Sequence, residues 1–192
     1  MKKIILASAS PRRKELLDKI GLKFEVAPSD ITEDLTSDLP PQELAKKLSQ
    51  EKALAVSKKY SDALIIAADT IGVFEGEIIG KPHTPAEAKK MLRNLNGKSH
   101  LVVTGFTIMD TKTGKTISKS VETAVYFRKL TEAEIDAYVK TGEPLDKAGG
   151  YAIQGLGALI VEKIAGDYYN VIGLPLSALV ESLKKFGIKV LY

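Results

Sequence analysis

The segment from Leu64 to Pro82 constrains the fold more than any other part of this chain. Leu64–Ala68 is a short apolar run, which is typical of a strand buried on both faces. The run stops at Asp69, and a β-type pattern then continues to Phe74, before a predicted hairpin turn at Glu75–Glu77. Because open α/β sheets bind ligands beyond the carboxyl ends of their strands, we expect Asp69 to lie at a functional site.

The predicted return strand of this hairpin, Ile78–Ile79, is followed by Gly80-Lys81-Pro82. A hairpin of this length would bring Lys81 back towards Asp69. A carboxylate and an ammonium that face the same site suit an anionic substrate that carries a metal ion. The alternative for Asp69 is a helix cap or a hydrogen-bonded turn residue, because Asp-Thr is common after strands.

The N-terminal residues predict a strand that turns directly into a helix. Lys3–Ala7 is short and apolar, and Lys14–Ile20 has helical spacing. Ser10 is a favourable N-cap residue, Pro11 suits the first helical position, and Gly21 ends the helix.

The start of this helix is a candidate phosphate-binding site. A helix N-terminus presents free N–H groups and a positive dipole end, and Ser8 and Ser10 flank it. Arg12 and Arg13 add guanidinium groups that bind phosphate oxygens in pairs. The alternative is an ordinary cap with two solvated arginines.

Two further charged residues are weaker candidates. Glu33 lies in a polar, acidic segment between Pro28 and Pro41 that we expect to be a loop, where a solvated charge is the simpler interpretation. Lys52 lies in the middle of a predicted helix, Pro41–Tyr60, and lysines on helices usually face solvent.

The rest of the chain mixes strand–helix alternation with a block of hairpin strands, which predicts an α/β fold with a mixed sheet. The two long strands around a turn at Thr111–Lys115 are expected to form much of a second lobe. Thr131–Glu134 is a capping box, and the glycine-rich Pro144–Gly157 indicates close backbone approach. The other expected elements are a strand at Phe24–Val26, a helix at Thr84–Leu95, strands at Ser99–Asp110, Thr116–Leu130 and Ala158–Ile164, a loop at Gly166–Pro175, and a helix at Leu176–Phe186.

Composition excludes several classes of protein. The 192 residues contain no cysteine, so thiol catalysis and disulfides are excluded, and the net charge of +4 permits anionic ligands without requiring nucleic acid. No Ser-His-Asp pattern, Walker glycine loop or dinucleotide glycine motif is present. No apolar run is long enough for a membrane span, and the first apolar run is too short for a signal peptide, so we expect a cytoplasmic protein. The candidates fit phosphoryl chemistry with a metal-activated water.

Several short motifs, in order along nearly the whole chain, carry a resemblance to a known family. They are Ser8–Arg13, Gln50–Ala53, Ala68–Thr70, Gly80–Pro82, Asp146–Gly149, Ile153–Gly155 and Ile172–Pro175. The chain resembles the Maf family of nucleotide pyrophosphatases, which hydrolyse nucleoside triphosphates to the monophosphate and pyrophosphate. The resemblance implies one Maf-like domain over residues 1–192, with a curved mixed sheet, flanking helices and two lobes around a cleft, similar to inosine triphosphate pyrophosphatases. It also implies a divalent cation, Mg²⁺ or Mn²⁺, a cytoplasmic location and a homodimer.

The resemblance also assigns roles to residues. Asp69 would accept a proton from water or bind the metal, and Glu33 matches a family acidic position and is a second candidate metal ligand. The substrate phosphates would be bound by Ser8, Ser10, Arg13, Lys52 and Lys81.

Three positions differ between branches of the family that prefer different bases. This chain has Arg12, Thr70 and Gln154 there, which resembles the branch that prefers dTTP and UTP, with modified pyrimidine nucleotides as further candidates. Another branch has Trp, Gln and Glu and is linked to 7-methyl-GTP. An amide such as Gln154 can both donate to and accept from the imide edge of thymine or uracil.

Two functions without turnover are the alternatives. One is a nucleic-acid-binding regulator of septum formation and cell division, suggested by the basic excess and by the family's association with division arrest. Against it, charge is spread along the chain and only 6% of residues are aromatic. The other is a nucleotide sensor that binds dTTP without product.

Overall fold

The computed structural model describes residues 2–34 and 37–191. Within them, seven strands form one sheet in the order β2-β1-β3-β5-β6-β7, and β4 pairs with β3 off this path. The strands are β1 (Lys3–Leu6), β2 (Glu25–Val26), β3 (Ala63–Phe74), β4 (Glu77–Ile79), β5 (Ser99–Asp110), β6 (Thr116–Phe127) and β7 (Val161–Ala165). β1 pairs in parallel with β2 and β3, whereas the β3–β4 and β6–β7 pairs are antiparallel. The predicted α/β class with a mixed sheet is therefore confirmed.

Helices are found where the spacing of apolar residues predicts them, with one addition. They are α1 (Pro11–Lys19), α2 (Pro41–Ser57), α3 (Pro85–Leu95), α4 (Glu132–Lys140), α5 (Tyr168–Ile172) and α6 (Leu176–Lys184). The loop predicted for Gly166–Pro175 is wrong in part, because it contains α5. The strand predicted from Ala158 is also wrong at its start, because the glycine-rich stretch continues as a short 3-10 helix, Gly155–Leu159.

The described residues form two compact units. The first comprises Met1–Thr70, Thr104–Val121 and Gly173–Tyr192, and the second comprises Ile71–Val103 and Glu122–Ile172. The turn between β5 and β6 therefore belongs to the first unit. The expectation that these two strands form much of a second lobe is wrong in part, because each strand contributes to both units.

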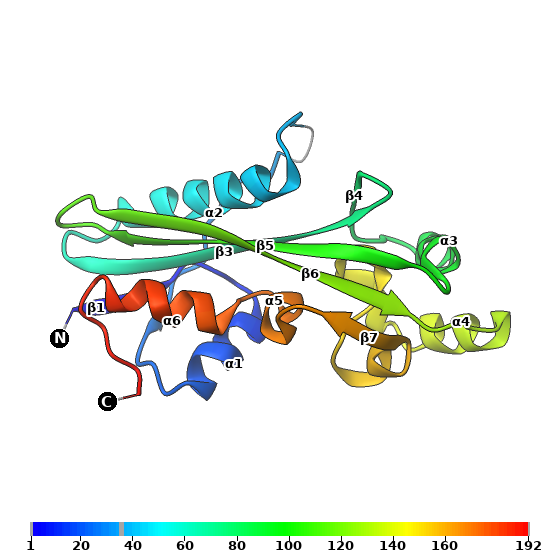
Figure 1. Cartoon of the computed structure of the whole chain (residues 1–192). Coiled ribbons are helices and arrows are strands. Elements are labelled where there is room, and N and C mark those ends of the chain that lie inside the picture. The colour runs from blue at the N-terminus through cyan, green and yellow to red at the C-terminus, as the bar shows by residue number, and fades with distance from the viewer. Residues whose placement is uncertain (1, 35–36, 192) are drawn as a thin grey trace. The chain divides into compact units, whose positions relative to one another are not determined.

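In the first unit, helix α2 packs directly on the sheet. One core cluster joins Ala53 and Val56 of α2 to Ile5, Ile65 and Ala67 of β1 and β3. Helix α2 lies against one face of the sheet in this unit, and α1 and α6 lie against the opposite face (Figure 1).

Helix α2 also approaches β5 unusually closely at Gly105. A Cβ atom at Gly105 would lie 2.2 Å from the carbonyl carbon and oxygen of Ala45. Since no real Cβ atom tolerates such a distance, only glycine permits this contact between helix and strand.

A chain of polar side chains continues this contact along α2. Because Ser49 Oγ donates to Lys46 O at 2.7 Å, it accepts from Thr107 Oγ1, also at 2.7 Å. Thr107 in turn accepts from Ser118 Oγ at 2.9 Å, and Ser118 accepts from Gln50 Nε2 at 3.0 Å. Each of these contacts has one donor and one acceptor, so this series of hydrogen bonds fixes α2 to β5 and β6.

The second unit has its own core between α3, α4 and the strands. Leu92 and Leu95 of α3 pack with Ile135 of α4 and with Val125 and Phe127 of β6. The predicted capping box at the start of α4 is confirmed, with Thr131 Oγ1 accepting from the Glu134 amide at 3.3 Å.

His100 is buried in this second core. Its Nε2 lies 3.0 Å from Tyr151 Oη, and its ring packs edge-on against Phe127 and Tyr151, with 5.3 Å between ring centroids in both pairs. Burial lowers the pKa of His100 to about 4, because the apolar surroundings disfavour the imidazolium.

We expect His100 to make the fold sensitive to mild acid. Between pH 6.5 and about 4 the unfolded chain binds a proton on this ring that the folded chain does not, so stability falls as the pH falls. At pH 5 the loss is about 2 kcal/mol, measured as the difference in free energy of urea unfolding between pH 7 and pH 5. His100→Gln should reduce this loss, while exposed His83→Gln should retain it. An unchanged loss in His100→Gln would contradict the assignment.

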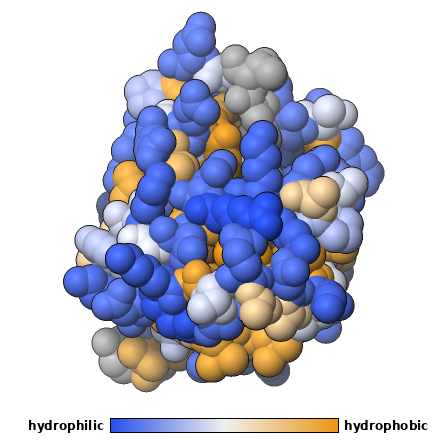
Figure 2. Space-filling model, turned by 90° about the vertical axis from the view of Figure 1, so that its right-hand side faces the viewer, coloured by the Kyte–Doolittle hydropathy of each residue, from blue (hydrophilic) through white to orange (hydrophobic). Residues whose placement is uncertain are grey.

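Hydrophilic residues cover most of the face drawn in Figure 2, and hydrophobic ones gather mainly towards its lower edge. Many surface cations pair with carboxylates, as in Lys3–Glu25 at 2.8 Å and Arg93–Glu132 at 2.6 Å. Among the helices described, none has the length and apolar character that crossing a membrane requires.

Candidate active site

Asp69 lies inside β3 and not at its end. The prediction that the strand stops at Asp69 is wrong, because β3 continues through Thr70 to Phe74. The neighbouring strand β1, however, ends at Leu6, which pairs with Ile66. Asp69 therefore lies three residues beyond the last residue of β3 that pairs with β1, at the level where the chain leaves β1 and turns into α1.

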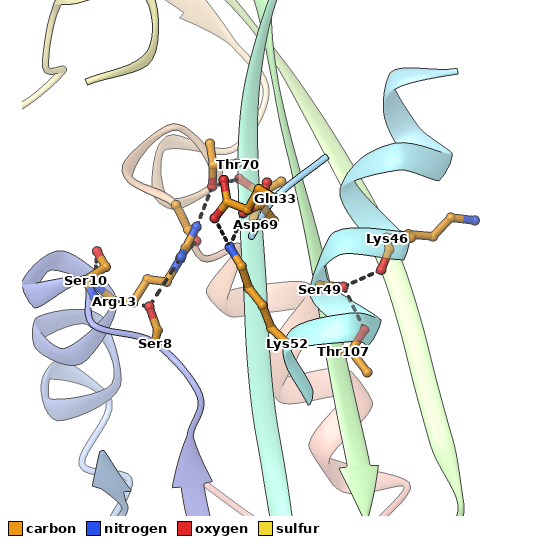
Figure 3. Close-up of polar contacts among 12 residues, drawn as sticks. Ser8, Ser10, Arg13, Glu33, Lys46, Ser49, Lys52, Asp69, Thr70 and Thr107 are labelled. Atoms are coloured by element: carbon orange, nitrogen blue, oxygen red, sulfur yellow. Dashed lines mark hydrogen bonds and ion pairs between the residues drawn. The ribbon is translucent and has the colours of Figure 1, made fainter. Parts of the chain in front are cut away.

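Lys52 of α2 joins two carboxylates (Figure 3). Its Nζ contacts Asp69 Oδ1 and lies 2.6 Å from Glu33 Oε1. Asp69 is 5% exposed and Lys52 is 7% exposed, whereas the Glu33 side chain is 41% exposed. The interpretation of Lys52 as a solvated helix residue is therefore wrong. Glu33 is an exposed loop residue, as the sequence predicts, but its carboxylate pairs with Lys52.

Asp69 has the electrostatic environment of a carboxylate that can accept a proton. Burial raises the pKa of Asp69, and the charge of Glu33 acts in the same direction. The positive charges of Lys52 and Arg13 oppose this increase. A carboxylate whose pKa is raised is a stronger base, and the two neighbouring cations favour its ionised form.

The side chain of Arg13 is held by three acceptors of the first unit. Its Nε donates to Gly173 O at 2.8 Å, and its two terminal nitrogens donate to Ser8 Oγ at 3.3 Å and to Thr70 Oγ1 at 3.0 Å. These bonds use three of the five N–H groups of the guanidinium. Burial lowers the pKa of Arg13, because it disfavours the charged guanidinium. The negative charges of Asp69 and Glu33 act in the opposite direction.

The turn from β1 into α1 has the predicted cap. Ser10 is the N-cap residue, and its Oγ accepts from the Arg13 amide at 3.5 Å. Buried Ser8 accepts from the Ser10 amide at 3.2 Å as well as from Arg13. The hydroxyl oxygens of Ser8 and Ser10 thus each accept hydrogen bonds from the protein. Their hydroxyl protons are the groups that can donate to a bound anion.

Thr70 connects Arg13 to the sheet. Because a guanidinium has no acceptor, Thr70 Oγ1 accepts from Arg13, and it also pairs with buried Thr104 Oγ1 at 2.9 Å. A Cβ at Gly173 would lie 3.3 Å from Thr70 Oγ1, and its φ of 122° disfavours other residues. Thr104 and Gly173 are absent from the predicted site residues. Gly173 is signalled only by its place in the Ile172–Pro175 motif.

Arg12 lies in the first turn of α1 and is half-buried. The two arginines are close enough that the positive charge of Arg12 acts on Arg13 and lowers its pKa further. Positive charge is therefore concentrated at this helix N-terminus, as the sequence predicts.

Two predicted site residues belong to the second unit. Exposed Lys81 follows β4, and the segment that contains it is fixed by a hydrogen bond from the Gly149 amide to Gly80 O at 3.0 Å. The motifs Gly80–Pro82 and Asp146–Gly149 are thus neighbours. Gln154 is half-buried and directly precedes the 3-10 helix Gly155–Leu159. The predicted approach of Lys81 to Asp69 stays a prediction.

The structure thus brings together most of the predicted residues of the first unit. Arg13, Ser8 and Thr70 form one connected group, and Lys52, Asp69 and Glu33 form another (Figure 3). The charges of Arg13 and Asp69 act on one another. The arrangement is one buried carboxylate, Asp69, under the influence of two cations: Lys52 of α2 and Arg13 at the N-terminus of α1.

Comparison with known proteins shows the family to which the chain belongs. A family model described as "Maf-like protein" matches residues 3–186. A protein of Moorella thermoacetica named dTTP/UTP pyrophosphatase is 50% identical over 190 residues, 99% of this chain and 98% of that protein. Proteins of the same name from Desulforamulus reducens and Syntrophus aciditrophicus are 47% and 49% identical, over 99% and 96% of this chain and 100% and 90% of theirs.

A solved structure described as that of the Staphylococcus aureus Ham1 protein is also similar, at a TM-score of 0.47 and 16% identity. The match covers 66% of this chain and 72% of the other. A similarity of this size supports no conclusion, so the predicted likeness to inosine triphosphate pyrophosphatases stays a prediction. The family model matches almost the whole chain, and the relatives are about 50% identical to it. These findings are sufficient to assign the family. This chain belongs to the Maf family.

Proposed function

We propose that this protein hydrolyses dTTP and UTP to the monophosphate and pyrophosphate. The observation that supports this most directly is the buried Asp69 paired with Lys52, within the electrostatic influence of Arg13. A base that activates water next to fixed cations is what attack on a phosphoanhydride requires. The names of the relatives at about 50% identity agree with it.

In this proposal the residues of the first unit divide catalysis and phosphate binding between them, and Asp69 serves either as the proton acceptor or as a metal ligand that activates water. As the acceptor, Asp69 takes a proton from the attacking water. Lys52 and Arg13 neutralise the charge that develops on the phosphate oxygens, and the N-terminus of α1 with Ser8 and Ser10 binds a phosphate group. We propose that Lys81 of the second unit also binds substrate phosphate.

We propose that a divalent cation binds together with the substrate. Among residues 2–34 and 37–191 there is no cluster of three or more His, Cys, Asp or Glu side chains that would hold a metal. Mg²⁺, however, commonly takes one or two carboxylates and completes its ligands with water and substrate phosphates. We propose that Asp69 and Glu33, which already face the same Lys52 ammonium, hold Mg²⁺ or Mn²⁺. When bound, the cation neutralises phosphate charge and makes a nearby water more acidic.

We propose that Arg12, Thr70 and Gln154 determine the preference for the base. Thr70 is held by Arg13 and Thr104, so its oxygen has a fixed position. The Gln154 amide has both a donor and an acceptor, which matches the imide edge of uracil and thymine.

A panel of nucleotides tests the proposal. We expect pyrophosphate release from dTTP and UTP in the presence of Mg²⁺ or Mn²⁺, with lower kcat/KM for CTP and 7-methyl-GTP, and loss of activity in excess chelator. Binding of dTTP without product would instead support a nucleotide sensor. Equal turnover of every nucleotide would contradict the assigned base preference.

The two properties that the resemblance adds, a cytoplasmic location and a homodimer, remain proposals, as does a single working domain over residues 1–192. Light scattering of the purified protein decides the oligomeric state. The alternative of nucleic-acid binding gains no support from the ion pairs on the surface, which neutralise several of the basic residues, including Lys3, Lys89 and Arg93. A steep salt-dependent affinity for DNA or RNA would revive it.

A further inference from the structure

Glu143 of the second unit accepts hydrogen bonds from three donors. Tyr138 Oη donates to Glu143 Oε1 at 2.8 Å, and the Gly157 amide donates to the same oxygen at 2.9 Å. The Leu156 amide donates to Oε2 at 3.1 Å. A single carboxylate thus binds two successive backbone amides directly after Gly155, and a side chain of α4.

Tyr138 extends this contact to the other side of Gln154. An ionised carboxylate only accepts, so the Tyr138 hydroxyl proton is directed at Glu143, and its oxygen accepts from the Ala152 amide at 3.1 Å. Glu143 and Tyr138 therefore fix the backbone at Ala152 before Gln154 and at Leu156 and Gly157 after it.

The segment between these contacts has little freedom. A Cβ at Gly157 would lie 2.0 Å from Ala152 O and 2.7 Å from Tyr138 Oη. Gly155 has φ +68°, and a Cβ there would lie 2.7 Å from Glu143 Oε2. The close approach predicted from the glycine-rich sequence is thus found here, between segments of the protein itself.

The charge state of Glu143 suits this role. Burial acts to raise the pKa of Glu143, but the hydrogen bonds from Tyr138, Gly157 and Leu156 outweigh it and hold the pKa below its usual value. Near neutral pH both oxygens are therefore acceptors, as the three donors require. The Lys147 ammonium, which binds Glu143 O at 2.8 Å, acts on the pKa in the same direction.

We propose that Glu143, together with Tyr138, is a positioning residue that fixes Gln154 and thereby determines how sharply the enzyme distinguishes uracil from cytosine. The proposal rests on the function proposed above, in which Gln154 contacts the base. At N3 and position 4 of the ring, uracil presents a donor and an acceptor, whereas cytosine presents an acceptor and a donor. An amide discriminates between them only if its orientation is fixed, because a freely rotating amide can satisfy either base.

Glu143→Gln is the variant that tests the proposal. The new amide has the shape of the carboxylate but directs an NH₂ group at one of the bound donors, so at least one hydrogen bond of the segment is lost. We expect the ratio of kcat/KM for UTP to that for CTP to fall about tenfold. Amide hydrogen exchange at Leu156 and Gly157 should become faster in the same variant. Tyr138→Phe, which leaves Glu143 in place, should lower the ratio in the same direction.

Glu134→Gln is the matched control. Glu134 belongs to the same unit and also accepts several hydrogen bonds, from Thr131 and Arg128, but none from the segment that contains Gln154. It should lower stability and leave the UTP/CTP ratio unchanged.

Four outcomes would count against the proposal or the function on which it rests. A UTP/CTP ratio that is unchanged in both Glu143→Gln and Tyr138→Phe would overturn the proposal, as would an equal fall in Glu134→Gln. If the unsubstituted protein hydrolysed neither nucleotide, the proposed function would fail instead. Hydrogen exchange at residues 152–157 would then still show whether Glu143 holds the segment, and unchanged exchange in Glu143→Gln would reject that too.

Discussion

Replacing Asp69 with Asn should lower kcat for dTTP hydrolysis by about 10²–10⁴-fold, the range that a general base contributes. The amide keeps the shape of the side chain and its contact to Lys52 but cannot accept a proton from water. Single-turnover measurements with saturating dTTP isolate the chemical step, and the affinity for dTTP should change far less than the rate.

The matched control for this variant is Asp110→Asn. Asp110 is also a buried aspartate of the first unit paired with a lysine, Lys2, at 2.5 Å. Its pKa is lowered to about 2, mainly by the hydrogen bond from Lys2, so it is no candidate base. Asp110→Asn should cost stability and leave kcat of the folded protein unchanged. Equal activity of Asp69→Asn and the unsubstituted protein would reject the role of Asp69.

The pH dependence provides a second readout of the same residue. A general base acts when it is ionised, so kcat should fall as the pH drops below the pKa of Asp69, which burial raises. Lys52 opposes that increase, so in Lys52→Met the acidic limb of the profile should move to higher pH. A shift in the opposite direction would show that another group titrates.

Local signals in the sequence predict the elements well, and the N-terminus shows why. The cap at Ser10, the proline after it and Gly21 at the end are chemical requirements of a helix, and they place α1 correctly. The apolar residues of β5, Leu101–Val103 and Phe106–Met109, likewise predict a strand with the observed bounds, Ser99–Asp110. These signals depend on neighbours within a few positions, which the sequence displays directly.

The boundary at Asp69 shows where such signals fail. A polar residue after an apolar run indicates a strand end only if its surroundings are solvent, and here they are another helix and a lysine. Whether Lys52 points at solvent or at Asp69 depends on which face of α2 packs on the sheet. That face is determined by contacts between segments distant in sequence, such as Gly105 against Ala45. Only the family resemblance, which assigns roles to residues without giving their positions in space, indicates that Lys52 and Glu33 belong to the site.

The second large effect is expected from Gly105→Ala. The added Cβ would lie 2.2 Å from the carbonyl group of Ala45 and 2.5 Å from the Lys46 amide nitrogen. These are backbone atoms, so no side-chain rotation relieves the contact, and α2 must move away from β5. Overpacking of this kind costs about 1–3 kcal/mol or more in the free energy of unfolding, measured by urea denaturation.

The displacement of α2 should also affect activity, because this helix carries Lys52. Moving the Lys52 ammonium away from Asp69 weakens the ion pair between them, and catalysis requires these groups to be held in position. The kcat of the folded protein should therefore fall as well. Gly72→Ala is the control: it is also a strand glycine, but its Cβ would meet the movable side chain of Ile79 at 3.3 Å. A Gly105→Ala protein as stable and active as Gly72→Ala would show that the close contact between α2 and β5 is not what positions Lys52.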